Sequence, residues 1–270
     1  MVLITKMRTV MQKQFGDVKV SLDGHVALVE ICRPPLNFFD VQLIKDLVAA
    51  FNLLDETPEC RASVLASDGK AFCAGANFNS GQSVLSSTEA TTGNPLYQAA
   101  VELFSCKKPI VGAIHGTATG GGLGLALVPD FRVTCPEARF VANFTRLGIH
   151  PGFGLTHVLP QLIGQQRANL MFYTGRRIKG EQAVEWGLAD ILTSQDKVRE
   201  EAFALANEIA EGAPLAVMST RATMRQGLAE KIKRFSDHED SEQAWLSETS
   251  DFAEGVKSVT ERRVGNFTGH

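Results

Sequence analysis

The amino-acid sequence predicts an α/β protein, with a core of alternating strands and helices followed by a helical C-terminal part. Up to about residue 192, short apolar runs typical of buried strands alternate with segments that carry apolar residues at helical spacing. Beyond residue 192 the chain has helical spacing throughout. Its 270 residues, with a hydrophobic content of 44%, suffice for one large core and an appendage.

The first predicted element is a hairpin. In "VKVSLDGHVALVEI", apolar and polar residues alternate on both sides of Asp23-Gly24, which is a strong hairpin signal. A helix over 40–56 follows and ends before Pro58. The next expected elements are a strand at 62–67, a helix at 95–105, a strand at 109–116, a glycine run that opens a helix, a strand at 131–135 and helices from 159 onward.

Two further segments complete the expected organisation. The polar Ser/Thr/Gly stretch at 79–94 is typical of a mobile surface loop near a site. The tail segments 194–210, 213–228 and 236–248 are each expected to be helical. Their apolar stripes form little core of their own, so we expect the tail to pack on the core or on another subunit.

Composition and charge argue against several classes of function. The net charge is −3 and no run rich in Lys and Arg occurs, so sequence-general nucleic-acid binding has little electrostatic support. No apolar run reaches the roughly 18 residues that a membrane span requires. Residues 1–15 are too short and too interrupted by Lys and Arg for a secretory h-region, which leaves an organelle-targeting segment or a frayed N-terminus open.

The five cysteines are scattered singly, at Cys32, Cys60, Cys73, Cys106 and Cys135. There is no CxxC pair and no Cys/His cluster at zinc spacing, so neither a metal site nor a disulfide framework is indicated. An odd number of thiols suits a reducing compartment. We therefore expect a cytoplasmic protein without a structural metal.

The stretch "HGTATGGGLGLALVPD" carries three consecutive glycines, Gly120–Gly122, at the start of an apolar helical segment. Bare backbone N–H groups at a helix start suit an anion. The dinucleotide fingerprint fails, because the position five residues on is Leu125 when counted from Gly120 and Leu127 when counted from Gly122. No GxxxxGK[ST] and no GxSxG occurs, which argues against a P-loop and an α/β-hydrolase.

A transient oxyanion fits the glycine run better than a phosphate does. Without β-carbons, a carbonyl oxygen can come within hydrogen-bonding distance of the backbone N–H groups. A second donor could come from the small residues around Gly75 in "AFCAGANF", directly after a buried strand. The residues alone leave an alternative open, in which both segments are packing glycines where a helix crosses a strand.

Six motifs then occur in an order that resembles the enoyl-CoA hydratase/isomerase (crotonase) superfamily, over about residues 15–267. They are "ICRPPLNFFD", "SDGKAFCAGANF", "PIVGAIHGTATGGGLGLAL", "LGIHPGFGLTHVLPQLIG", "TGRRIKGEQAVEWGLAD" and "DFAEGVKSVTERR". The resemblance implies an N-terminal extension at 1–14, a spiral core of ββα units at 15–195 and a C-terminal helical trimerisation region at 196–270. It implies a homotrimer or homohexamer, and no cofactor, because coenzyme A is part of the substrate.

The resemblance also implies a set of site residues. The acyl-CoA thioester carbonyl would lie between the backbone N–H groups of Ala76 and Gly121, which would stabilise a thioester enolate. The implied substrate- and CoA-binding residues are Arg33, Leu36, Ala74, Asn77, Phe78, Gly152 and Arg262. Asn77 stands where many family members carry Asp, so the local charge is altered. For Arg33, a surface arginine without a phosphate partner is an equally good interpretation.

Two carboxylates that the resemblance leads us to expect are missing. Family hydratases place one glutamate at the position of Gly124 and another at the position of Phe144. We expect a pocket that is roomier beside Gly124 and more apolar beside Phe144, which would suit a bulky or aromatic acyl group. His150 is the candidate substitute for proton transfer, because an imidazole titrates near neutral pH; the alternative is a structural histidine.

The sequence therefore predicts an acyl-CoA-processing enzyme that stabilises a thioester enolate, nominally by hydration of a 2-enoyl-CoA. Losing one general acid or base typically costs about 10²–10⁴-fold in rate, which puts ordinary hydration in doubt. One alternative is a different enolate reaction, such as decarboxylation, isomerisation or C–C bond cleavage on an acyl-CoA. The other is a catalytically silent acyl-CoA-binding homologue.

Overall fold

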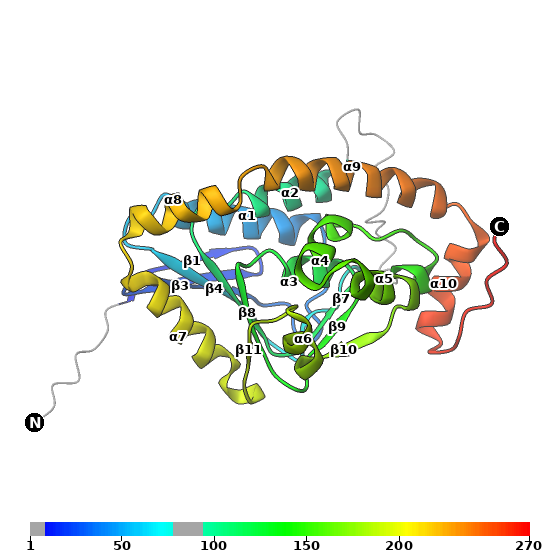
Figure 1. Cartoon of the computed structure of the whole chain (residues 1–270), viewed down its shortest axis with the longest axis horizontal. Helices are drawn as coiled ribbons and strands as arrows, with labels where there is room; N and C mark the ends of the chain where they lie inside the picture. Colours follow the sequence, from blue (N-terminus) through cyan, green and yellow to red (C-terminus); the bar gives the residue numbers. More distant parts are fainter. Residues whose placement is uncertain (1–8, 78–93) are drawn as a thin grey trace, which may run out of the picture.

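The computed structural model describes residues 9–77 and 94–270, whose strands form two sheets (Figure 1). The seven-stranded sheet has the order β1(Thr9–Phe15), β2(Val18–Asp23), β3(Val26–Ile31), β4(Ala62–Ser67), β6(Ile110–Ile114), β8(Phe131–Thr134) and β11(Ile191–Leu192). The four-stranded sheet has the order β10(Arg177–Lys179), β9(Arg139–Val141), β7(Thr117–Thr119) and β5(Ala71–Cys73). The surface loop expected at 79–94 lies, apart from Asn94, outside the described residues.

The expected hairpin is confirmed. Strands β2 and β3 pair antiparallel with Asp23 opposite Val26, and Gly24 takes a positive φ of 57° in the turn. Strand β1 pairs antiparallel with β2, so residues 9–14 of the expected N-terminal extension belong to the sheet. From β3 to β11 the neighbouring strands are parallel. Strands β4 and β6 are buried along their whole length, as expected of apolar runs in a parallel sheet.

Helices connect the strands. The helix expected at 40–56 is α1(Val41–Asp55), and the Asp40 side chain caps it by accepting a 2.8 Å hydrogen bond from the Leu43 N–H. The helices that follow up to residue 186 are α2(Pro95–Phe104), α3(Gly121–Ala126), α4(Leu155–Ile163), α5(Gln165–Thr174) and α6(Gly180–Trp186). A short 3-10 turn, η1(Phe144–Leu147), precedes α4, and a second, η2(Gln195–Lys197), follows β11.

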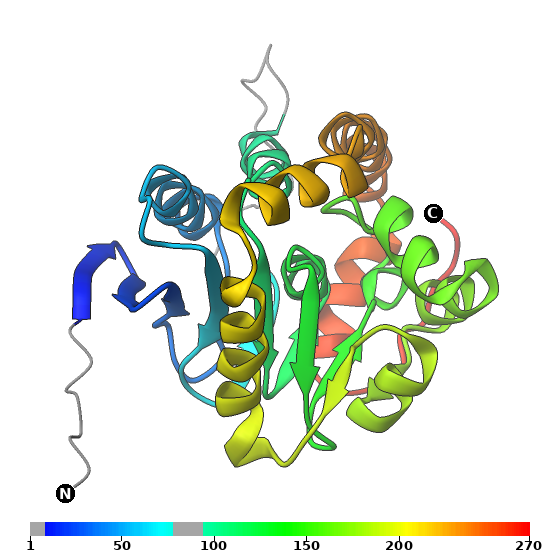
Figure 2. The ribbon, with the colours of Figure 1, turned by 60° about the vertical axis from the view of Figure 1, so that its left-hand side comes forward.

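The C-terminal part is helical, as predicted. It comprises α7(Val198–Glu211), α8(Pro214–Met224), α9(Leu228–Leu246) and α10(Ser250–Thr260). Helix α7 packs on β4, β6 and β8 (Figure 2), and α9 runs along α2 and α4 (Figure 1). Helix α10 packs against η1, at the side of the molecule away from α7. None of the helices in the described residues combines the length and apolar character that crossing a membrane requires.

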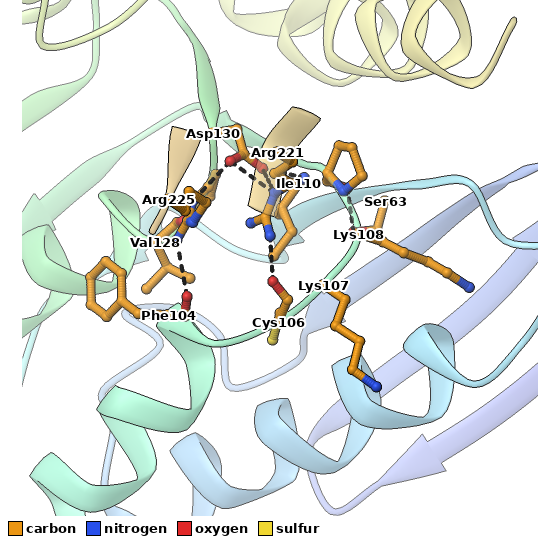
Figure 3. Close-up of polar contacts among 12 residues, drawn as sticks. Ser63, Phe104, Cys106, Lys107, Lys108, Ile110, Val128, Asp130, Arg221 and Arg225 are labelled. Atoms are coloured by element: carbon orange, nitrogen blue, oxygen red, sulfur yellow. Dashed lines mark hydrogen bonds and ion pairs between the residues drawn. The ribbon is translucent and has the colours of Figure 1, made fainter. Parts of the chain in front are cut away.

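A largely buried charge cluster fastens α8 to the core (Figure 3). Asp130, at the end of the glycine-rich segment, accepts hydrogen bonds from the Ile110 N–H at 2.9 Å and from Arg221 Nε at 2.9 and 3.0 Å. Arg225 Nη1 lies 2.8 Å from the same carboxylate. The two arginines also donate to the Cys106 and Phe104 carbonyls at the end of α2. One carboxylate thus joins α8, the start of β6 and the segment after α3.

Candidate functional site

Two parallel strands bring the glycine-containing segments together. Strands β5 and β7 pair parallel, with Cys73 opposite Ala118, so the residues that follow each strand emerge at the same edge. Gly75 follows β5 with a φ of 81°, and a β-carbon placed on it would lie 2.6 Å from the Thr119 carbonyl oxygen and 3.8 Å from the Gly121 nitrogen. Only a residue without a side chain permits this approach. The segments of Ala76 and Gly121 are therefore neighbours.

Both expected donors are available at this edge. Gly121 is the first residue of α3, and its N–H has no acceptor in the described part of the chain. The Ala76 N–H likewise has none there: in the bridge between Phe39 and Ala76, it is the Phe39 N–H that donates, to the Gly75 oxygen at 3.0 Å. Both residues line one cavity. Two free backbone donors thus face a common space.

The same glycines are also packed tightly. A β-carbon on Gly121 would overlap the Phe39 ring, and one on Gly122 would overlap the Cys73 carbonyl group. The two interpretations left open by the sequence are therefore compatible. Close packing fixes the glycine run against β5 and Phe39, and the fixed run presents its first N–H to the cavity.

The cavity has a volume of about 460 Å³. Its walls come from α2, α9 and α10, and from the segments around Phe39, Ala76, Gly121 and Phe144. Of the residues that the resemblance implied, the cavity is lined by Leu36, Ala74, Ala76, Asn77, Gly121, Phe144, Gly152 and Arg262. Phe78 lies outside the described residues. Among the described residues of the lining, none is an Asp, Glu, His, Lys or Cys.

Arg33 does not line this cavity. Its Nε lies 2.6 Å from Asp17 Oδ2 and its Nη1 lies 2.9 Å from Asp40 Oδ2. Burial lowers the pKa of the guanidinium, but the hydrogen bonds and charges of Asp40 and Asp17 together outweigh it and raise the pKa. The charge of Arg33 is already matched inside the protein, so the structure gives its expected role at a CoA phosphate no support.

His150 also lies apart from the expected donors. It lines a second cavity, of about 680 Å³, between η1, α5 and the C-terminal residues. Its Nδ1 lies 2.8 Å from the Pro151 carbonyl oxygen, and its ring centroid is 5.9 Å from that of His238. The structure therefore does not bring the His150 imidazole together with Ala76 and Gly121.

The positions of the two missing glutamates differ from each other. Phe144 lines the cavity and is buried, as an apolar replacement should be. The expected extra room beside Gly124 is absent: a β-carbon there would lie 2.7 Å from Cδ1 of Phe153, whose ring occupies the space. The expectation of a roomier pocket was therefore wrong. Phe153 contacts Phe39 at a ring-centroid distance of 5.9 Å, which continues the apolar wall.

A polar pair that the sequence did not single out lies in the same cavity. The Tyr97 hydroxyl is 2.6 Å from Gln243 Oε1, and Gln243 Nε2 is 2.7 Å from the His150 carbonyl oxygen. Both side chains line the cavity although both are almost fully buried. Tyr97 is one of only two tyrosines in the chain, a weak signal. Gln243 carries no signal in the sequence, because the packing of α9 against α2 determines which way its side chain points.

The comparisons with known proteins bear on this geometry. Residues 22–270 match the family model described as enoyl-CoA hydratase/isomerase. The chain belongs to this family. It is 36% identical over 220 residues to the probable enoyl-CoA hydratase EchA14 of Mycobacterium tuberculosis, covering 78% of this chain and 82% of that one. It is 28% identical over 256 residues to the carnitinyl-CoA dehydratase of Salmonella typhi, covering 92% of this chain and 96% of that one.

Several solved structures share the fold. The enoyl-CoA hydratase/isomerase from Pseudoalteromonas atlantica is similar with a TM-score of 0.84 and 26% identity, covering 93% of this chain and all of that one. DspI of Pseudomonas aeruginosa is similar with a TM-score of 0.73 and 26% identity, covering 97% and 100%. The predicted crotonase-like α/β core with a helical C-terminal region is therefore confirmed.

Proposed function

We propose that this protein acts on an acyl-CoA thioester and stabilises its enolate oxygen with the N–H groups of Ala76 and Gly121. The observation that carries the proposal is the pair of free backbone donors at one edge of the 460 Å³ cavity. A single donor of this kind typically contributes about 3–4 kcal/mol to transition-state stabilisation. Backbone N–H groups keep this capacity at every physiological pH. Membership of the enoyl-CoA hydratase/isomerase family supports the thioester as the substrate class.

The proposed CoA groove runs along the cavity lining. Leu36, Ala74 and Asn77 would face the pantetheine, and Gly152 the acyl end. Arg262, which is exposed at the cavity rim, would meet a CoA phosphate. The proposal needs no cofactor, since the CoA arrives with the substrate.

We also propose a homotrimer or homohexamer in the cytoplasm. The C-terminal region exposes large apolar side chains, among them Leu215, Met224 and Trp245 at 80%, 80% and 55%, and such side chains gain free energy when a partner covers them. The five free cysteines suit a reducing compartment. Light scattering of the purified protein tests the assembly: a monomeric mass would contradict it.

The nominal reaction is hydration of a 2-enoyl-CoA, with water placed by groups other than carboxylates. A second candidate is favoured by one observation, the absence of Asp and Glu from the described cavity lining. Decarboxylation of a malonyl-type thioester needs no base: the C–C bond to the carboxylate breaks, its electron pair forms the enolate, CO₂ leaves, and a proton then adds to carbon.

Mass spectrometry of reaction mixtures tests these proposals. The protein is incubated separately with crotonyl-CoA, a long-chain enoyl-CoA and malonyl-CoA. A product heavier by one water, formed at a catalytic rate, supports hydration, and acetyl-CoA from malonyl-CoA supports decarboxylation. If neither product forms, the protein is incubated with butyryl-CoA in D₂O. Exchange of the α-proton for deuterium supports an enolate-forming enzyme with another substrate. Binding without exchange supports a catalytically silent homologue.

A further inference from the structure

Helix α10 ends beside the cavity with an arginine where a glycine is common. The Arg262 N–H donates to the Val259 carbonyl oxygen at 3.2 Å, and the Arg263 N–H donates to the Ser258 carbonyl oxygen at 3.0 Å. These two hydrogen bonds form the Schellman arrangement, in which the residue after the helix cap is left-handed and is most often glycine. Here that residue is Arg262, with a φ of 55°. Its β-carbon makes this conformation unfavourable.

The Arg262 side chain makes no contact inside the protein that offsets this cost. It is exposed at the rim of the cavity, and its guanidinium forms no hydrogen bond or ion pair with the residues that the structure describes. The guanidinium groups of Arg33 and Arg263, by contrast, are paired with carboxylates. Backbone strain of this kind concentrates at functional sites and persists only where the surrounding structure holds it.

Glu254 holds the chain that follows Arg262. Its two carboxylate oxygens accept hydrogen bonds from Arg263 Nη1 and from Arg263 Nη2, the second at 2.9 Å. The same carboxylate accepts from the Asn266 N–H at 2.8 Å. On the other side of Arg262, Glu261 Oε2 lies 2.6 Å from Arg263 Nε. The hydrogen bonds from Arg263 and Asn266 lower the pKa of Glu254 to about 2, so this bidentate clamp is charged at physiological pH.

We propose that Glu254 is a positioning residue, which holds the left-handed backbone of Arg262 through Arg263 and so keeps the Arg262 guanidinium at the cavity rim for a phosphate of CoA. This inference rests on the proposed acyl-CoA function. Glu254 does not line the cavity, so it acts through Arg262. Without the clamp, Arg262 would relax to a right-handed conformation and its side chain would leave the rim.

Calorimetric titration with two esters tests the inference: butyryl-CoA, and butyryl-pantetheine, which lacks the phosphates. Arg262→Gly should weaken the binding of butyryl-CoA about tenfold, because one charge-assisted hydrogen bond is lost. Glu254→Gln should weaken it about threefold. Both variants should bind butyryl-pantetheine as wild type does. Glu248→Gln, at an exposed glutamate between α9 and α10, is the matched control and should bind both esters as wild type does.

A double variant separates positioning from a general structural role. In the Arg262→Gly background, Glu254→Gln should cause no further loss of affinity for butyryl-CoA, because glycine carries no charge that the clamp could place. A further threefold loss would show that Glu254 acts independently of Arg262 and would overturn the inference. Arg262→Gly should also raise the midpoint of urea unfolding, since glycine adopts the left-handed conformation without strain. A lower midpoint would show that the arginine serves stability, which contradicts the inference.

The remaining outcomes distinguish this inference from the proposed function. If butyryl-CoA binds, but Arg262→Gly or Glu254→Gln binds it as tightly as wild type does, the inference is overturned and the acyl-CoA proposal stands. Equal losses for both esters also overturn it, because the variants would then disturb the cavity itself. If wild type binds neither ester, the proposed function fails and the inference fails with it.

Discussion

The ring of Phe153 stands where a side chain on Gly124 would have to go, with Cδ1 2.7 Å from the position of its β-carbon. Phe153 is almost fully buried and adopts a left-handed φ of 67°, which costs a residue with a β-carbon of order 1 kcal/mol or more. The next residue, Gly154, donates its N–H to Glu239 at 2.7 Å, which holds this turn. The two residues therefore form a unit, in which the absence of a side chain at Gly124 makes room for the Phe153 ring.

From this contact we expect that a glutamate at position 124 is accommodated only when Phe153 is also replaced. Gly124→Glu alone should lower the free energy of unfolding by about 3 kcal/mol or more, because it forces a carboxyl group into a filled apolar space. Phe153→Gly removes the obstructing ring and suits the left-handed backbone. Urea unfolding of both single variants and the double variant gives the coupling energy.

The double variant should be more stable than the sum of the two single changes predicts. It should also hydrate crotonyl-CoA faster than wild type, since one carboxylate is returned to the cavity wall. Additive stabilities would show that the contact between positions 124 and 153 is unimportant.

A second prediction isolates the Gly121 N–H. Gly121→Pro in the wild-type protein would remove the donor but would also collide with the Phe39 ring. The comparison is therefore made in the Phe39→Leu background, where Gly121→Ala keeps the N–H and Gly121→Pro removes it. Proline is tolerated at the first position of a helix. Turnover of the substrate identified by mass spectrometry should fall about 10²–10³-fold in the proline variant relative to the alanine variant. Equal turnover would remove Gly121 from the proposed site.

Several elements could be predicted because their cause is local. The hairpin needs only the alternation around Asp23-Gly24, and the glycine run marks the start of α3 by its composition. The adjacency of Ala76 and Gly121 depends on the parallel pairing of β5 with β7, which the sequence indicated only through family resemblance. Local patterns thus predicted the hairpin and the start of α3, and the family motifs predicted which backbone groups meet; the short strands β5 and β7 that bring them together were not predicted.

Other features depend on packing between distant segments. Tyr97 and Gln243 are 146 positions apart, and only the docking of α9 on α2 brings them together. His150 is two residues from Gly152, yet His150 lines the second cavity and Gly152 lines the cavity that contains Ala76 and Gly121. The space beside Gly124 is filled by the ring of Phe153, which is distant in the sequence. Phe153 lies on a left-handed turn that no short sequence pattern indicates.

The buried cluster of Figure 3 gives a stability prediction. Asp130 is the carboxylate partner of Arg221 and Arg225, whose side chains are 9% and 16% exposed. Burial and the neighbouring charge of Arg221 lower the pKa of Arg225, and the Asp130 carboxylate opposes them. Asp130→Asn should lower the free energy of unfolding by about 3 kcal/mol, because two largely buried cations lose their counter-charge.

The matched control for that change is Asp237→Asn, since Asp237 pairs with Lys233 in an exposed ion pair on α9. Such pairs contribute about 0–1 kcal/mol. Urea unfolding followed by circular dichroism measures both variants. If Asp130→Asn costs no more than Asp237→Asn, the cluster does not fasten α8 to the core.

The last prediction concerns Glu239, a buried carboxyl group that accepts hydrogen bonds from the N–H groups of Gly154 and Thr156 and from the Thr156 hydroxyl. Burial raises its pKa from 4.5 to about 7, and the hydrogen bonds partly oppose this. The folded protein therefore retains this proton to higher pH than the unfolded chain does. Glu239 should destabilise the folded state progressively as pH rises from about 4.5 to about 7, by about 3 kcal/mol in total.

Urea unfolding at pH 5 and pH 8 tests this sign, with Glu239→Gln as the variant that cannot titrate. The glutamine turns an amide group toward the Gly154 N–H, so the variant should be less stable than wild type at pH 5. Its free energy of unfolding should nevertheless fall less between the two pH values than that of wild type, because the glutamine side chain cannot ionise. Glu230→Gln, at an exposed position of the same helix, should retain the wild-type pH dependence. A variant Glu239→Gln with the full wild-type decrease would show that Glu239 is ionised in the folded protein already at pH 5, with its three hydrogen bonds outweighing its burial.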